Sequence, residues 1–228
     1  MGHVQYYSSN LPVPGVAVNL TGSTLQSSMT DANGLFGFAS VPSGAMSLQP
    51  TKRGDLNFSV TALDAAYVLQ FVAGLRAFSN DQKLAADVTG NGSVSALDAA
   101  RILQYQAGLL RHCSVTTTTV CTGDGNCPMG ETCISRFPVA LTCGSDWLFR
   151  PVPTPTANQT LVQPQISAGM CQEGAISYSS ETLPLSAQDF VAILFGDTTG
   201  NWMPTIATPT RTPSRTLTPD STLTPPVS

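Results

Sequence analysis

The residues in this 228-residue chain that are best suited to chemistry are the oxygen-bearing side chains between Asp87 and Asp98. The segment reads Asp-Val-Thr-Gly-Asn-Gly-Ser-Val-Ser-Ala-Leu-Asp, with oxygen at its first, third, fifth, ninth and twelfth positions and Gly92 at the sixth. Calcium takes about six to eight oxygen ligands, and a glycine at the sixth position permits the turn that gathers them. The spacing therefore predicts a calcium loop; a hydrophilic turn capped by an aspartate is the alternative. The expected ligands are Asp87, Thr89, Asn91, Ser93 through its carbonyl, Ser95 and Asp98.

The segment that follows this loop has a near copy 34 residues earlier in the chain. Residues 60–75 and 94–109 are identical at eleven of sixteen positions, which indicates an internal repeat. In each copy the apolar residues recur at spacings of three and four, which predicts two helices packed against each other. Gly74 and Gly108 stand where such helices need a left-handed cap.

The loop before the first helix departs from the twelve-residue pattern. It is two residues shorter, and Phe58 stands where glycine is expected. One interpretation is a tighter calcium site, and the other is a vestigial turn that leaves Asp64 to cap its helix. The ligands of the tighter site would be Asp55, Asn57, Ser59 and Asp64.

Paired loops that each end in Asp and run into a single helix resemble the dockerin module, and the run Val94-Ser-Ala-Leu-Asp-Ala is typical of its repeats. The resemblance implies calcium as the cofactor, calcium-dependent folding, and docking onto a cohesin-type receptor that fastens polysaccharide-degrading enzymes to a scaffold. An intramolecular domain and a polysaccharide are the other expected partners. The resemblance also implies that the residues just before each closing Asp help to select the receptor. Here these are Ala62, Leu63, Ala96 and Leu97.

Residues 1–51 alternate apolar and polar residues between turn signals, which predicts a small antiparallel β-sandwich. The runs Pro14–Leu20, Thr30–Phe38 and Val41–Gly44 resemble the carboxypeptidase-regulatory-like or Cna-B-like prealbumin-type sandwich. That family acts mostly as a spacer or stalk, so the resemblance implies a fold and not a binding site.

The six cysteines all lie between residues 113 and 171, an even number that suggests disulfides in an oxidising compartment. Zinc is the alternative, but three of them are separated by five residues, where zinc sites favour about two to four. The first residues contain no export signal, so we expect the chain to be part of a longer exported polypeptide at the cell surface or outside the cell. The cysteines are Cys113, Cys121, Cys127, Cys133, Cys143 and Cys171.

Residues 137–203 return to strand-like apolar runs that resemble no family, and 204–228 are rich in Pro and Thr, which predicts a disordered tail. Trp147, Tyr178 and Trp202 could form a sugar-stacking platform, although such aromatics are more commonly core residues. The predicted fold class is multidomain and mainly β. Its domains are a β-sandwich (1–51), a two-helix dockerin-like calcium module (52–111), a Cys-rich segment (112–136), a β-domain (137–203) and the tail (204–228).

The composition excludes some classes of function. Only 11% of the residues are charged and the net charge is −4, so there is no basic face for a nucleic acid. No apolar stretch is long enough for a membrane span. The sequence therefore favours a non-catalytic exported protein in extracellular assembly or adhesion around polysaccharide. The alternatives are a fragment of a secreted glycoside hydrolase or peptidase, and a carbohydrate-binding C-terminal β-domain. An enzyme would have to use the carboxylates Asp146, Glu173, Glu181, Asp189 and Asp197, with no His in that region.

Overall fold

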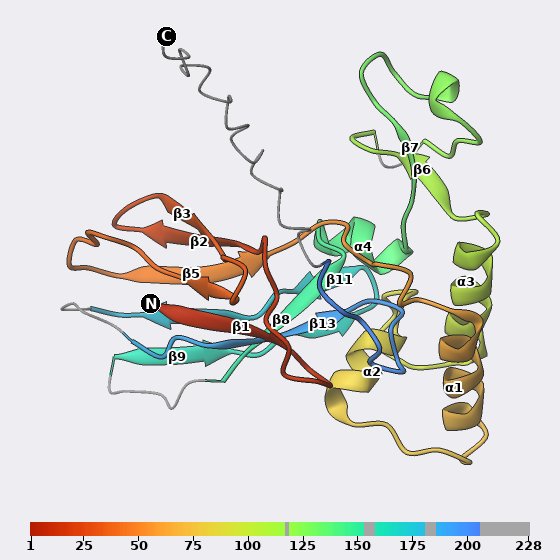
Figure 1. Cartoon of the computed structure of the whole chain (residues 1–228), viewed down its shortest axis with the longest axis horizontal. Coiled ribbons are helices and arrows are strands. Elements are labelled where there is room, and N and C mark those ends of the chain that lie inside the picture. The colour runs from red at the N-terminus through yellow and green to blue at the C-terminus, as the bar shows by residue number, and fades with distance from the viewer. Residues whose placement is uncertain (117–118, 153–157, 181–185, 206–228) are drawn as a thin grey trace, which may run out of the picture.

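The computed structural model describes residues 1–116, 119–152, 158–180 and 186–205 (Figure 1). Two β-sheets face each other as a sandwich, and helices lie at one end. One sheet has the strand order β3-β2-β5-β12-β9 and the other the order β4-β1-β13-β8. The strands are β1 (Gly2–Tyr6), β2 (Ala17–Gly22), β3 (Gln26–Met29), β4 (Leu35–Phe36), β5 (Met46–Thr51), β8 (Trp147–Pro151), β9 (Gln159–Val162), β12 (Ala175–Tyr178) and β13 (Phe190–Leu194).

Both sheets combine strands from the two ends of the chain. Strand β13 lies between β1, to which it is parallel with Val4 opposite Phe190, and β8, to which it is antiparallel. In the other sheet β12 pairs with β5, with Ile176 opposite Leu48. Side chains from all of these strands form one hydrophobic core. Residues 1–51 do supply strands to both layers, but the prediction of two separate β-domains, 1–51 and 137–203, is wrong for these strands because they share sheets and core. The prealbumin-type resemblance stays a prediction.

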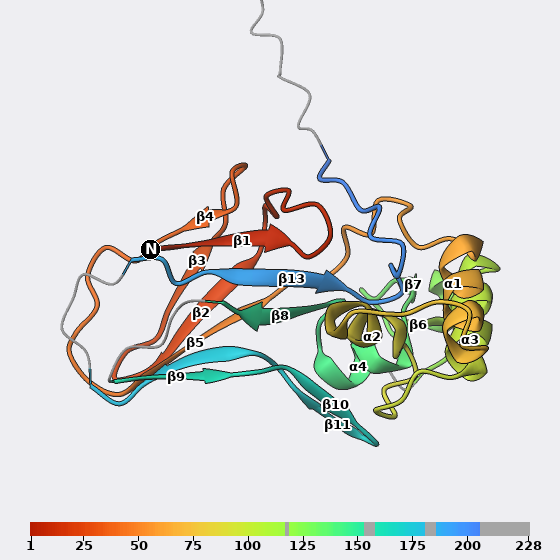
Figure 2. The ribbon, with the colours of Figure 1, turned by 90° about the horizontal axis from the view of Figure 1, so that it is seen from below.

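A helical layer packs against the four-stranded sheet at the end where β8 begins and β13 ends (Figure 2). It consists of α1 (Ala62–Val72), α2 (Asn80–Ala86) and α3 (Ala96–Gln106). Leu148 of β8 and Ile193 of β13 point away from the sandwich core and pack in the same cluster as Val68 and Ile102 of the helices. The strands β8 and β13 are therefore buried on both faces, which explains why they read as continuous apolar runs.

The two repeat helices begin and end alike. Thr61 and Ser95 are the N-caps, and each forms a capping box with the Asp three residues later. Gly74 and Gly108 follow the helix ends with φ of +73° and +68°, so the predicted left-handed caps are confirmed. The helix α2, which lies between the repeats, was not predicted.

The Cys-rich segment forms a short hairpin of β6 (Arg111–Cys113) and β7 (Cys133–Ser135) with a 3-10 turn, η1 (Asp124–Asn126). Three disulfides, Cys113–Cys127, Cys121–Cys133 and Cys143–Cys171, pair all six cysteines. The predicted disulfides are confirmed, and no thiolate is left for zinc. The third disulfide joins the end of α4 (Pro138–Cys143) to β11 (Met170–Gln172), which pairs with β10 (Gln165–Ser167).

The three aromatics proposed as a sugar platform are core residues. Trp147, Tyr178 and Trp202 are exposed by only 0, 4 and 1%. The favoured alternative, core packing, is confirmed, because the residues belong to the sandwich core, where Trp147 and Trp202 meet edge to face. The predicted tail, apart from Pro204 and Thr205, lies outside the described residues. Within the part of the chain that is described, no helix is both long enough and apolar enough to span a bilayer.

Candidate metal centre

The loop 87–98 connects α2 to α3 and begins and ends on a buried carboxylate. Asp87 is the C-terminal cap of α2 and Asp98 lies in the first turn of α3. The loop folds around Asp87. Its Oδ1 accepts hydrogen bonds from the backbone N–H groups of Gly90 (2.9 Å) and Asn91 (3.1 Å), and its Oδ2 accepts from that of Gly92 (2.7 Å). Gly92 has φ of +86°, as its position in the turn requires.

Thr89 links Asp98, the last residue of the loop, to Asp87, the first. Asp98 Oδ1 accepts hydrogen bonds from the Thr89 N–H (3.0 Å) and hydroxyl (2.8 Å), and the same hydroxyl lies 3.2 Å from Asp87 Oδ1. Ser95 donates its N–H and hydroxyl to Asp98 Oδ2. The structure therefore places the first, third, ninth and twelfth positions of the predicted site together. At the fifth position, Asn91 Oδ1 accepts from the N–H and hydroxyl of Ser93.

The charge at this centre is not balanced by protein cations. Burial raises the pKa of the Asp87 carboxyl, the N–H groups of Gly92, Asn91 and Gly90 lower it, and the nearby Asp98 raises it. Among the described residues no Lys or Arg forms an ion pair with either carboxylate. Two desolvated carboxylates, a hydroxyl and an amide oxygen form a hard-oxygen donor set, and that set fits calcium.

The loop before α1 is built differently. Asp55, expected as a ligand, forms an ion pair with Lys52 (2.8 Å), and the Asn57 side chain donates to the carbonyl of Met203 (2.8 Å). Both have positive φ, of +60° and +47°, as does Phe58 at +59°. Ser59 donates its hydroxyl to the carbonyl of Leu56. The four residues predicted as a tighter site are therefore not gathered around Asp64.

The Asp64 carboxylate contacts a segment that the sequence reasoning did not select. The N–H of Thr199 donates to Asp64 Oδ1 (2.8 Å), and Thr198 donates its hydroxyl to the Asp64 carbonyl (3.1 Å). A signal was present, since Asp197-x-Thr199-Gly200-Asn201 repeats Asp87-x-Thr89-Gly90-Asn91. This likeness is confined to the loop, whereas the internal repeat at 60–75 and 94–109 is marked by its helices.

The residues expected to select a receptor lie on the surface. Ala62, Leu63, Ala96 and Leu97 are all exposed, at the N-terminal ends of the two repeat helices. Leu63 and Leu97 are exposed by 54 and 51%.

The carboxylates considered for an enzyme are held in separate interactions. Asp146 is paired with Arg136, Glu173 accepts a hydrogen bond from Gln49, and Asp189 accepts one from the His3 backbone. Asp197 is enclosed by its own loop, and Glu181 lies outside the described residues. These four carboxylates lie in separate interactions and therefore do not form among themselves the facing pair that glycoside hydrolysis uses.

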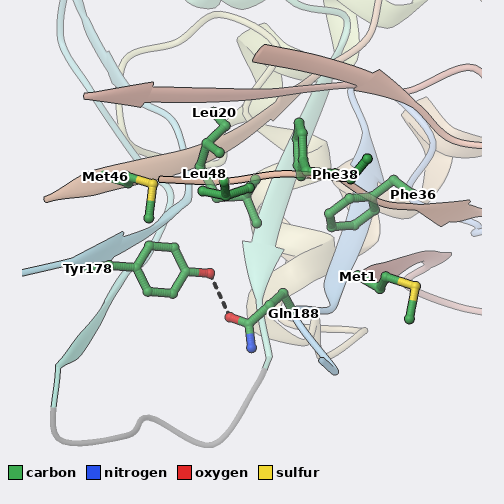
Figure 3. Close-up of a pocket in the computed structure, with 10 residues that line it drawn as sticks. Met1, Leu20, Phe36, Phe38, Met46, Leu48, Tyr178 and Gln188 are labelled. Atoms are coloured by element: carbon green, nitrogen blue, oxygen red, sulfur yellow. Dashed lines mark hydrogen bonds between the residues drawn. The ribbon is translucent and has the colours of Figure 1, made fainter. Parts of the chain in front are cut away.

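A pocket of about 230 Å³ opens at one end of the sandwich (Figure 3). Its polar groups are Gln188 and Tyr178, whose hydroxyl donates to Gln188 Oε1 (2.7 Å). No carboxylate, His or Lys side chain belongs to the described lining, so the pocket offers no acid–base pair. The remaining lining residues are Met1, Leu20, Phe36, Phe38, Ala39, Val41, Met46 and Leu48.

Comparison with curated proteins and with solved structures gives no match. A family model, the Dockerin type I domain, matches residues 53–105. This range contains α1, α2, the loop 87–98 and all of α3 except its last residue. Dockerin domains bind calcium and cohesins, are themselves non-catalytic, and usually occur in extracellular or cell-surface proteins. The helical layer of this chain is thus similar to a type I dockerin, and the rest of the chain lies outside that similarity.

Proposed function

We propose that this protein is a non-catalytic, calcium-dependent docking component of an extracellular assembly, in which the helical layer binds a cohesin-like receptor. The sandwich would act as the rigid body that carries the module, in an assembly associated with polysaccharide degradation. The observation that carries the proposal is a symmetric pair of apolar surfaces on the two repeat helices, beside the calcium loop.

The repeat places matching leucines on the outside of both helices. Leu63 and Leu97 are exposed by 54 and 51%, and Leu69 and Leu103 by 47 and 45%. Their helix neighbours Val68 and Ile102 are fully buried, so the module already has its own core. Exposed leucines at the same places in both copies offer apolar area on which a receptor would pack. The repeat symmetry means that a receptor meets nearly the same surface on either helix.

Calcium would order this surface. The ion would be held by Asp87, Thr89, Asn91 and Asp98, with Ser93 and Ser95 completing the loop. It would supply the positive charge that offsets two buried carboxylates and would thereby fix α3 relative to α2. With only two carboxylates we expect a dissociation constant of roughly 10⁻⁵ to 10⁻³ M, which suits extracellular calcium.

Calcium titration into chelator-treated protein tests the metal half of the proposal. At a calcium concentration about a hundred times the dissociation constant, one site stabilises the folded state by about 2.7 kcal/mol. For a chain of this size that corresponds to roughly 5 to 11 °C in melting temperature. Far-UV circular dichroism and calorimetry report it, with magnesium as the control. An unchanged melting temperature and unchanged helicity would remove calcium from the proposal.

Binding to a panel of purified cohesins, measured with and without calcium, tests the docking half. The double variant Leu63→Ala/Leu97→Ala should abolish binding, while either single variant should retain it because the other helix still offers its surface. Leu25→Ala changes a leucine on the sandwich that is 82% exposed, more than either helix leucine, and is the control. Binding that survives in the double variant, or that ignores calcium, would contradict the assigned surface.

A further inference from the structure

The segment that follows β13 copies the first half of the calcium loop. Asp197-Thr-Thr-Gly-Asn matches Asp87-Val-Thr-Gly-Asn at four of five positions, 110 residues further along the chain. The backbone is folded in the same way. Asp197 Oδ1 accepts from the N–H groups of Gly200 (2.7 Å) and Asn201 (3.2 Å), and its Oδ2 accepts from that of Trp202 (2.9 Å). These are the counterparts of the three bonds that Asp87 accepts from Gly90, Asn91 and Gly92.

The second half of this loop is supplied by residues 59–64, just before and in the first turn of α1. The N–H of Thr199 donates to Asp64 Oδ1 (2.8 Å), as that of Thr89 does to Asp98. Asp64 Oδ2 accepts from the N–H (2.7 Å) and hydroxyl (2.9 Å) of Thr61, as Asp98 Oδ2 does from Ser95. Residues 197–202 therefore occupy positions one to six of a calcium loop and residues 59–64 occupy positions seven to twelve.

The charge balance points independently to a cation at this place. Asp64 and Asp197 are both 0% exposed, and neither forms an ion pair with a Lys or Arg among the described residues. Tyr6 donates its hydroxyl to Asp197 Oδ2 (2.6 Å), which supplies a hydrogen bond but no positive charge. Two fully buried carboxylates facing one loop are costly unless a cation neutralises them. Beside them, the exposed Asn201 side chain makes no hydrogen bond within the described part of the chain.

We propose that the chain binds a second calcium ion at a split loop whose two halves lie more than a hundred residues apart in sequence. The proposal rests on the proposed calcium function of the loop 87–98, whose geometry it copies. The ligands would be Asp197, Thr199, Asn201, the Ser59 carbonyl, Thr61 and Asp64. Six of the twelve positions lie outside the segment that matches the dockerin family, so the ion would clamp the end of β13 to the start of α1.

The loop also carries its own spectroscopic label. Trp202 occupies the sixth position, where the loop 87–98 has Gly92. Terbium substitutes for calcium in oxygen-ligand sites and emits when a nearby tryptophan is excited. We therefore expect terbium emission under tryptophan-selective excitation to report the split site, while calcium stoichiometry from equilibrium dialysis or native mass spectrometry counts both sites.

The test uses the full chain after chelator treatment. The wild type should bind two calcium ions. Asn201→Ala should weaken one of them by at least about tenfold and remove the terbium emission. Because the exposed Asn201 side chain makes no hydrogen bond within the described residues, the melting temperature in chelator should stay unchanged. Asp98→Asn is the matched control in the other loop, and it should lower calcium binding while leaving the emission intact.

The outcomes separate the two proposals. One calcium ion per chain, lost in Asp98→Asn and unaffected by Asn201→Ala, would overturn the split site and leave the loop 87–98 in place. Two ions with binding and terbium emission unchanged in Asn201→Ala would also overturn it. The split site would be established if Asn201→Ala lost one calcium ion and the terbium emission, while Asp98→Asn kept the emission and the calcium ion of the split site.

Discussion

The buried ion pair between Arg136 and Asp146 joins the residue that follows β7 to the residue that precedes β8, and its removal should be costly. Arg136 donates from Nε and Nη2 to the two Asp146 oxygens, both at 3.1 Å, and the Gly54 N–H donates to Asp146 Oδ2 (2.7 Å). The two side chains are exposed by only 5 and 12%. Asp146→Asn would leave a buried guanidinium without its counter-charge, and such losses cost about 3–5 kcal/mol. In a chain of this length that is a fall in melting temperature of roughly 6–20 °C.

A second ion pair of the same geometry is the control. Arg150 donates to both oxygens of Asp81 at 2.9 Å, but Arg150 is 35% exposed, so Asp81→Asn should cost less than about 1 kcal/mol. Adding Arg136→Met to Asp146→Asn should recover stability, because the asparagine oxygen can still accept from Gly54 and no charge remains buried. Denaturant unfolding followed by tryptophan fluorescence gives all the free energies. Equal costs for Asp81→Asn and Asp146→Asn, or no recovery in the double variant, would refute the reasoning.

Two further predictions concern the disulfide beside the helical layer and the interface between the repeat helices. Replacing Cys143 and Cys171 by Ser opens a loop of 28 residues. If the disulfide acts by restricting the unfolded chain, this should lower the free energy of unfolding by about 3.5 kcal/mol. A loss below about 1 kcal/mol in urea unfolding would contradict the prediction. Ile102→Ala should cost about 2–5 kcal/mol because Ile102 of α3 is fully buried in the cluster that also contains Val68 of α1. Its neighbour Leu103 is 45% exposed, so Leu103→Ala should lower the free energy of unfolding far less and should instead weaken receptor binding. Calorimetry and a cohesin binding assay measure the two effects. Equal losses of thermal stability in the two variants would count against the assigned helix faces.

Local features could be predicted from the sequence because their causes lie within one turn or one loop. The contiguous loop Asp87–Asp98, the two repeat helices and their glycine caps depend on contacts between residues at most eleven positions apart. The disulfide state also followed from the even number of cysteines and their grouping between residues 113 and 171, although the pairing did not.

Long-range features could not be predicted in this way. Alternation along β1 shows which face is buried, but nothing in it names Phe190 of β13 as the neighbour of Val4. The same limit affected the first repeat. Asp55 and Asn57 stand where a contiguous loop would need them, yet Asp64 is met by Thr199, 135 residues away. An aromatic side chain such as Trp202 is more commonly a core residue than part of a sugar site, and the packed sheets show that it belongs to the core.

The position of β13 inside its sheet has a consequence for how the molecule forms. The helical hairpin and the disulfide-linked hairpin can assemble from nearby segments as soon as each is synthesised. The β1 strand, in contrast, has no partner on one side until residues 190–194 are present, since β13 separates it from β8. Closing so long a loop is slow on entropic grounds. We therefore expect the pairing of β13 with β1 and β8 to be the last and slowest step of folding, after the local hairpins have formed.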